Sequence, residues 1–270
     1  MKQLLTLVLL IPILALSKSE AEQSHRKISI GLSLSPDYSY RKLKPTIYYW
    51  GDTIHTAQTN ANAEYVDSLN SIEKGKLATT FGISLTYKMS KHLSLHSGFF
   101  YSDKGIQSKG FLWMSTISGQ VSISRKDKNV KQKFNFFEVP VSFSYAFDLD
   151  SSGNTQVHLI AGSTLCLNSG GHEFYSRKWD NGSANINDEN SFGTSKVYPI
   201  NILHIGYTVG AGISKKISNR VIITFEPVYK YYFSEFFTHR SKSYLNTIGN
   251  GMFIEKPYSF GCNLGLSIEI

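Results

Sequence analysis

Residues 77–105 restrict the possible folds of this chain most, because apolar and polar residues alternate there on both sides of a short break at 89–91. The apolar residues on the two arms are Leu77, Phe81, Ile83, Leu85 and Tyr87, then Leu93, Leu95, Phe99 and Tyr101. A period of two predicts β-strands, and two such runs around a break predict a hairpin. The opposite face carries mainly Gly, Ser, Thr and His. One apolar face and one small, polar face together predict a sheet whose outside contacts lipid.

Six further segments alternate in the same way, at residues 27–38, 134–147, 156–167, 200–215, 220–233 and 257–270. The connections between the eight segments alternate in length. Four are long, at residues 41–76, 105–133, 168–198 and 234–256, and the three between them are tight turns. The first long connection shows no sustained period and is predicted to be a loop. The second contains FLWMSTISGQVSIS, a candidate for a hairpin that protrudes beyond the membrane.

An even number of strands, with short turns at one rim and long loops at the other, is typical of outer-membrane barrels. In hydrocarbon every backbone donor and acceptor needs an internal partner, so the sheet must close. We therefore predict an all-β fold, an eight-stranded antiparallel up-and-down transmembrane β-barrel with short periplasmic turns, long extracellular loops and both termini in the periplasm. The mean hydropathy of −0.18 agrees, because barrel strands are only half apolar. A soluble lipocalin-like barrel is the structural rival, and it would need apolar residues inside.

The first residues have the pattern of a secretion signal. Lys2 gives a positive start, residues 4–16 form an apolar run, and small residues follow. The run is shorter than the roughly 20 residues of a spanning helix, which disfavours the alternative of a retained anchor. We predict a signal peptide at residues 1–21 and one outer-membrane barrel domain at residues 22–270.

Several local phrases resemble the Bacteroidota outer-membrane β-barrel family that includes the PorT-like proteins. They are GLSLSPDYS, FGISLTYKMSKHLSLHSGFFYSDKG, FFEVPVSFSYAF, ISNRVIITFEPVYKYYF and FGCNLGLSIEI. Together with the order of the strands, they extend the resemblance over nearly all of the chain after the signal segment. The resemblance implies an eight-stranded barrel in the cell outer membrane. It also implies a role in protein export or cell-envelope assembly for some members.

The alternation predicts a polar network inside the barrel. The charged and histidine residues at the inward-facing positions of their strands are Glu138, Glu226, Lys230, His96, His158 and His204. An eight-stranded barrel is just wide enough for side chains to fill, and unpaired buried charges are costly, so opposite charges should pair there. Two interpretations remain open: a polar plug that holds the barrel shut, or a proton-linked or gated pore.

No catalytic residues, metal ligands or cofactor are predicted. The inward histidines lie at different heights, and the spacing shows no Ser–His–acid arrangement, so we expect a protein that is not an enzyme. Three inward histidines are also compatible with a metal site, and the alternative is that each is hydrogen-bonded in the lumen.

Positive charge is concentrated at the end of the second long connection, and the chain as a whole carries a formal net charge of +8. The cluster consists of Arg125, Lys126, Lys128, Lys131 and Lys133. At an outer-membrane surface it would meet lipid and lipopolysaccharide phosphates, and the alternative is a solvated loop with no dedicated partner. Nucleic acid is excluded as a partner by the export signal.

Two functions follow from these patterns. One is a non-enzymatic structural or accessory component of the cell envelope, in contact with other envelope or secretion proteins. The other is a surface binding module whose extracellular loops or narrow lumen bind a ligand or a host surface.

Overall fold

The computed structural model describes residues 28–45, 53–117, 120–178, 185–192, 201–235 and 253–270. Side chains are described within these ranges except at residues 53–62, 110–129, 173–178, 185–192 and 253. In chain order the described elements are β1 (Ile28–Pro45), α2 (Thr53–Ile72), β2 (Glu73–Lys88), β3 (Leu93–Ile117), β4 (Gln120–Asp148), β5 (Thr155–Lys178), β6 (Asn185–Phe192), β7 (Leu203–Lys216), β8 (Val221–Tyr232) and β9 (Phe253–Glu269).

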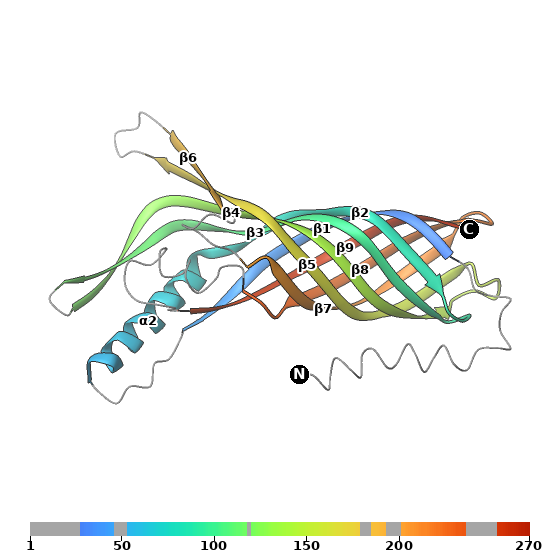
Figure 1. The fold of residues 1–270 in the computed structure, drawn as a ribbon, viewed down its shortest axis with the longest axis horizontal. Coiled ribbons are helices and arrows are strands. Elements are labelled where there is room, and N and C mark those ends of the chain that lie inside the picture. Colours follow the sequence, from blue (N-terminus) through green and yellow to red (C-terminus); the bar gives the residue numbers. More distant parts are fainter. Residues whose placement is uncertain (1–27, 46–52, 118–119, 179–184, 193–200, 236–252) are drawn as a thin grey trace.

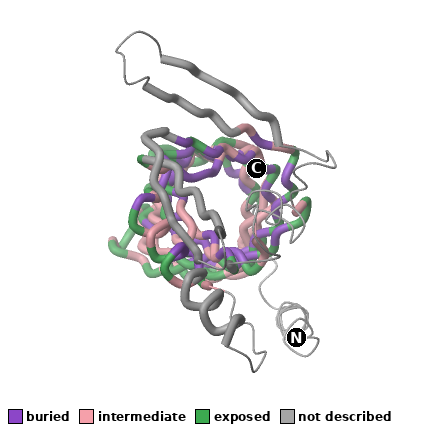
Figure 2. Tube along the Cα trace, turned by 90° about the vertical axis from the view of Figure 1, so that its left-hand side faces the viewer, coloured by how far each residue is buried: buried purple, intermediate pink, exposed green. Residues whose placement is uncertain are grey.

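Eight of the strands close into one antiparallel barrel. The order around the sheet is β4-β3-β2-β1-β9-β8-β7-β5, and β4 pairs with β5 to complete the ring. Figure 2 looks at one end of the barrel and shows the ring. The short strand β6 pairs with the far end of β5, outside the ring (Figure 1). The predicted eight-stranded antiparallel barrel is confirmed.

The outside of the barrel is an apolar band. Its exposed side chains include Ile30, Leu32, Phe81, Ile83, Phe99, Val141, Leu159, Val209, Phe225 and Leu264. On β1 the exposed apolar residues run from Ile28 to Tyr38. Ten residue steps along a strand tilted by about 40° span about 25 Å, the height of the apolar band of outer-membrane barrels. This exposed apolar surface requires lipid around it, and it excludes the lipocalin-like alternative.

The two ends of the barrel differ. At one end, called the short-turn end here, β2–β3, β4–β5 and β7–β8 are joined by tight turns. The first described residue and the last lie there too, since Ile270 N donates to Ile28 O at 2.8 Å. At the opposite end, called the long-connection end, β3, β4 and β5 continue past the other strands (Figure 1). The predicted alternation of short and long connections is confirmed.

The long connections contain more regular structure than their sequences indicated. The second forms the protruding hairpin of β3 and β4, whose pairing continues to Ile117 and Gln120, as the alternative interpretation anticipated. The third is not a simple loop, because β5 continues to Lys178 and pairs with β6. Strand pairing beyond the membrane needs only backbone hydrogen bonds, so these segments extend the sheet without a sustained alternation of apolar and polar residues.

The first long connection also differs from the prediction, because it contains the helix α2. Only four apolar residues, Tyr65, Val66, Leu69 and Ile72, follow a helical spacing near its end, and the preceding turns are mostly small and polar. Tyr65, Val66 and Ile72 are buried against the barrel. Among the described residues, no helix is long and apolar enough to cross a bilayer.

Candidate functional site

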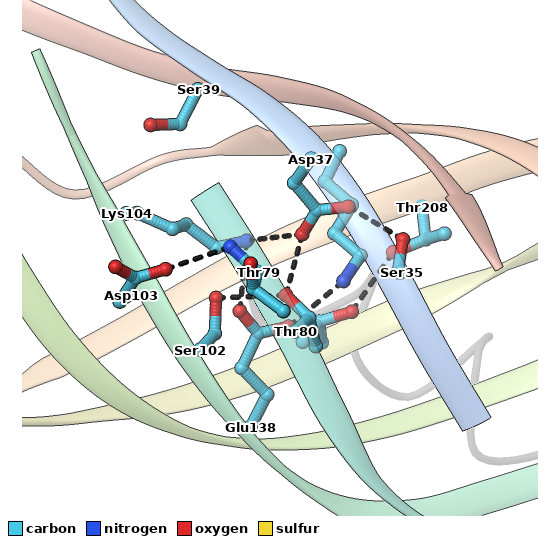
Figure 3. Close-up of polar contacts among 12 residues, drawn as sticks. Ser35, Asp37, Ser39, Thr79, Thr80, Ser102, Asp103, Lys104, Glu138 and Thr208 are labelled. Carbon is cyan, nitrogen blue, oxygen red and sulfur yellow. Dashed lines mark hydrogen bonds and ion pairs between the residues drawn. The ribbon is translucent and has the colours of Figure 1, made fainter. Parts of the chain in front are cut away.

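Four charged side chains form a layer across the barrel interior. They are Asp37 of β1, Lys104 of β3 and Glu138 of β4, which are labelled in Figure 3, and Lys230 of β8. Lys104 Nζ lies 3.2 Å from Asp37 Oδ2 and 3.0 Å from Glu138 Oε1. Lys230 Nζ lies 2.9 Å from Glu138 Oε2. We call these four residues the charged layer; with two carboxylates and two ammonium groups, it is electrically neutral.

Two hydroxyl groups also donate hydrogen bonds to the Asp37 carboxylate in this layer. Ser35 Oγ donates to Asp37 Oδ1 at 2.6 Å, and Thr80 Oγ1 donates to Asp37 Oδ2 at 2.5 Å. Ser102 Oγ lies 2.9 Å from Thr80 Oγ1. The side chains of Asp37, Lys104 and Glu138 are each 1 % exposed, so every charge here depends on its protein partners. The arrangement connects β1, β2, β3, β4 and β8 across the lumen.

A second group of polar side chains lies nearer the short-turn end. His158 Nε2 is 3.0 Å from Glu226 Oε1, and Asn263 Nδ2 donates to Glu226 Oε2 at 3.3 Å. His96 lies 2.7 Å from Ser144 Oγ and 3.1 Å from Thr86 Oγ1. A cavity of about 110 Å³ separates this group from the charged layer, with His96, Glu138, Glu226 and Lys230 in its lining. It has room for a few water molecules, and its polar lining can hydrogen-bond them.

His204 lies apart from the other two histidines. Its ring nitrogens are 2.9 Å from Asn201 O and 2.8 Å from Ser234 Oγ, and Phe136 packs edge-on against the ring. The structure therefore gives each of the three histidines its own hydrogen-bond partners. Within the described residues, no group of three or more His, Cys, Asp or Glu is placed to hold a metal ion.

All six predicted interior residues thus point inward, in three separate groups: Glu138 with Lys230, Glu226 with His158 and His96, and His204 alone. Sequence reasoning missed Asp37 and Lys104, which complete the charged layer. Both share the inward parity of their strands. The sequence therefore contains the signal for both residues, although Lys104 lies at the very end of its predicted strand.

The basic cluster lies on the extension of β4. The side chains of Arg125, Lys126 and Lys128 are outside the described set. Lys131 is exposed, whereas Lys133 Nζ lies 3.2 Å from Asp103 Oδ2, which also contacts Lys76 Nζ at 3.1 Å. At least one member of the cluster therefore pairs with a carboxylate on β3.

Helix α2 is attached to the rim of the long-connection end by polar contacts. Asn70 accepts a hydrogen bond from Leu43 N and donates one to Leu43 O, both at 3.0 Å, so its amide pairs with β1 as a neighbouring strand would. Arg41 Nε and Nη2 donate to the Glu73 carboxylate at 3.0 and 2.6 Å, and Arg41 Nη1 donates to Glu255. We call Arg41, Glu73 and Glu255 the rim triad. It joins β1, β9 and the start of β2, directly after the helix.

The docking of α2 should weaken at high pH. Burial and the nearby Glu73 carboxylate raise the pKa of Tyr65 from 10.0 to about 12, and Arg41 opposes this shift. The docked helix favours the neutral phenol, so its stabilisation is complete below pH 10 and is lost as the pH rises to about 12. We expect a fluorophore at Ser71→Cys to become more accessible to iodide over this interval. Tyr65→Phe should remove the dependence, and an unchanged pH profile in Tyr65→Phe would contradict the assignment.

This chain is similar to known outer-membrane barrel proteins. The sequence model of the family described as "Outer membrane protein beta-barrel domain" matches residues 21–238. No curated protein matches the chain. Among similar solved structures, Ail of Yersinia pestis is 11% identical, and the match covers 91% of this chain and 97% of that chain with a TM-score of 0.34. Neisserial surface protein A is 12% identical, with 90% of this chain and 97% of that chain covered and a TM-score of 0.39. The outer membrane protease OmpT of Escherichia coli is 9% identical, with 90% and 97% of the two chains covered and a TM-score of 0.40.

Proposed function

Because the chain belongs to the outer membrane protein beta-barrel family, we propose that it is a closed, non-enzymatic barrel that presents a binding surface outside the cell. In this proposal the long-connection end faces outward, and both termini lie in the periplasm. Residues 1–21 act as the export signal and residues 22–270 form the mature barrel. The family match covers residues 21–238, nearly all of which lie in the proposed mature barrel.

The observation that carries the proposal is the asymmetry of the barrel. Beyond the apolar band, β3, β4, β5 and β6 form one continuous sheet at the long-connection end (Figure 1). We call this extension, residues 109–117, 120–129, 173–178 and 185–192, the outer platform. The short-turn end has only tight turns among its described residues. A function in recognition is therefore best placed on the platform, where Arg125, Lys126 and Lys128 of the basic cluster also lie.

The barrel interior favours a barrel that anchors the outer platform in the membrane, rather than one that transports solutes. The charged layer crosses the lumen from β1 to β4 and β8, and ion pairs at 2.9–3.2 Å leave its charges compensated. Moving a solute through would separate buried charges, which costs several kcal/mol per ion. We expect the purified barrel in a planar bilayer to show no stable single-channel conductance.

A second candidate is an accessory component of the cell envelope, as in PorT-like proteins of Bacteroidota. The observation that favours it is a set of exposed apolar side chains at the short-turn end. Leu149, Ile217 and Ile270 are 62%, 56% and 77% exposed there. These residues could contact a secretion or assembly protein in the periplasm.

Site-specific cross-linking in intact cells separates the two functions. A photoreactive residue at Lys131, exposed on β4 just below the platform, should yield a discrete adduct. The matched position Ser152, exposed in the β4–β5 turn, should yield none. Replacing residues 110–128 by an Asn-Gly turn between the paired Lys109 and Asn129 should abolish the Lys131 adduct. An adduct from Ser152 alone would overturn the surface-binding proposal in favour of the envelope component.

A further inference from the structure

A groove of about 380 Å³ opens on the outer wall of the barrel at the long-connection end, between β1, β2 and β9. Its lining includes Tyr38, Tyr40 and Tyr258 on one side, with Lys42, Lys74 and Asn70 toward the helix. Arg41 and Glu73 of the rim triad also line it, and these two charges pair with each other at 2.6 Å. This groove is separate from the lumen and from the outer platform.

The base of the groove is continuous with the apolar band. Tyr38 is 46% exposed and lies over Gly75, where an added Cβ would be 2.3 Å from its ring. Tyr38 pairs across the sheet with Leu77 on one side and Phe260 on the other, which are 72% and 54% exposed. Acyl chains against the band would therefore reach the groove without crossing polar surface.

The upper side of the groove is basic. Lys42 lines the groove, and Lys256, its direct cross-strand partner on β9, lies beside the lining. The pair is one outward position farther from the membrane than the paired Tyr40 and Tyr258. Lys74 is also exposed in the groove lining. Among the described residues, none of these three lysines has a carboxylate partner, whereas Arg41 beside them is bound by Glu73 and Glu255.

Two like charges directly opposite each other on neighbouring strands destabilise a sheet unless an anion lies between them. Four residue steps separate Lys42 from Tyr38, so its Cα lies about 10 Å beyond the end of the apolar band. Lysine side chains at this height reach the level of lipid headgroups. Tyrosines directly below such lysines are typical of the membrane interface.

We propose that this groove binds the phosphorylated headgroup of a membrane lipid in the leaflet at the long-connection end. Lys42, Lys74 and Lys256 contact the phosphate, Tyr40 and Tyr258 contact the headgroup sugar or glycerol, and the acyl chains lie along Tyr38, Leu77 and Phe260. The ligand class is an anionic phospholipid or glycolipid, anchored by its chains as well as by its phosphate.

The test is native mass spectrometry of the purified full-length protein with monophosphorylated lipid A, or with the same lipid after enzymatic dephosphorylation. We expect one phosphorylated lipid to be retained and the dephosphorylated lipid to be lost. Lys42→Gln/Lys256→Gln should weaken binding by on the order of 30-fold, because each lysine near an anionic headgroup contributes about fivefold. The matched control is Lys91→Gln/Lys215→Gln, which removes two exposed lysines at the short-turn end.

Three results would overturn the proposal. The first is equal retention of phosphorylated and dephosphorylated lipid. The second is an equal loss of binding in both double variants, which would indicate non-specific attraction by net charge. The third is displacement of the lipid by an equal concentration of inorganic phosphate, which would indicate a site for free phosphate. Heat-resistant gel mobility of each variant confirms that the barrel is folded.

Discussion

Glu138→Gln is expected to lower the temperature at which the barrel loses its compact, heat-resistant gel mobility more than any other single substitution in the charged layer. Glu138 is the only one of the four residues that contacts both lysines, at 3.0 Å and 2.9 Å. Without its charge, one carboxylate, that of Asp37, remains to balance the two ammonium groups, and the side chains of Asp37 and Lys104 are each 1 % exposed. Breaking a buried ion pair from one side typically costs about 3–5 kcal/mol.

A double-mutant cycle with Lys230→Met makes the prediction specific. Lys230→Met alone leaves one ammonium for two carboxylates and should also destabilise the barrel. The combination with Glu138→Gln restores a neutral pair of Asp37 and Lys104, so the double variant should be more stable than the sum of the two single effects predicts.

Glu269→Gln is the matched control for this cycle. Glu269 also bridges two lysines, Lys88 at 2.8 Å and Lys216 at 2.6 Å, but these lysine side chains are 30% and 28% exposed at the short-turn end. Water can solvate them when the carboxylate is neutralised, so the loss should be about 1 kcal/mol or less. Strictly additive effects of Glu138→Gln and Lys230→Met would falsify the charged layer as an energetic unit.

In the charged layer, the inward direction of each side chain is predictable from the sequence, but the contacts between the side chains are not. Parity along a strand is a local property, so the alternation correctly indicated that Glu138 and Lys230 face inward. Which inward residues meet depends on the stagger of strands around the ring, which parity does not contain. Asp37 and Lys104 show this: they lie on β1 and β3, separated by β2, and meet inside the ring at 3.2 Å.

Helix α2 was missed for a different physical reason. Amphipathic periodicity reveals a helix when a full apolar stripe is buried. Among the side chains that the structure describes on α2, at residues 63–72, the buried ones are Tyr65, Val66 and Ile72. Much of its attachment is polar: the Asn70 amide pairs with the backbone of Leu43, and the rim triad follows immediately. Contacts of this kind depend on residues distant in sequence, such as Glu255, and leave no periodic signal.

Arg41→Met is therefore expected to release α2 while leaving the membrane barrel closed. Two carboxylates, Glu73 and Glu255, have side chains 9% and 0% exposed and would lose the guanidinium between them. The expected local loss is about 3–5 kcal/mol, as for other buried pairs broken from one side. Hydrogen exchange at residues 63–72 should accelerate accordingly, whereas exchange in β7 and β8 should not change.

Arg41→Lys distinguishes charge from geometry in the rim triad. A lysine keeps the positive charge but cannot reproduce the two parallel hydrogen bonds to Glu73 together with the third to Glu255. We expect exchange in α2 to be intermediate between the native protein and Arg41→Met. Arg220→Met, at an exposed arginine of the short-turn end, is the control and should leave α2 protected. If Arg41→Met leaves exchange in α2 unchanged, the apolar contacts of Tyr65, Val66 and Ile72 are sufficient to hold the helix, and the rim triad stabilises only the strands that it joins.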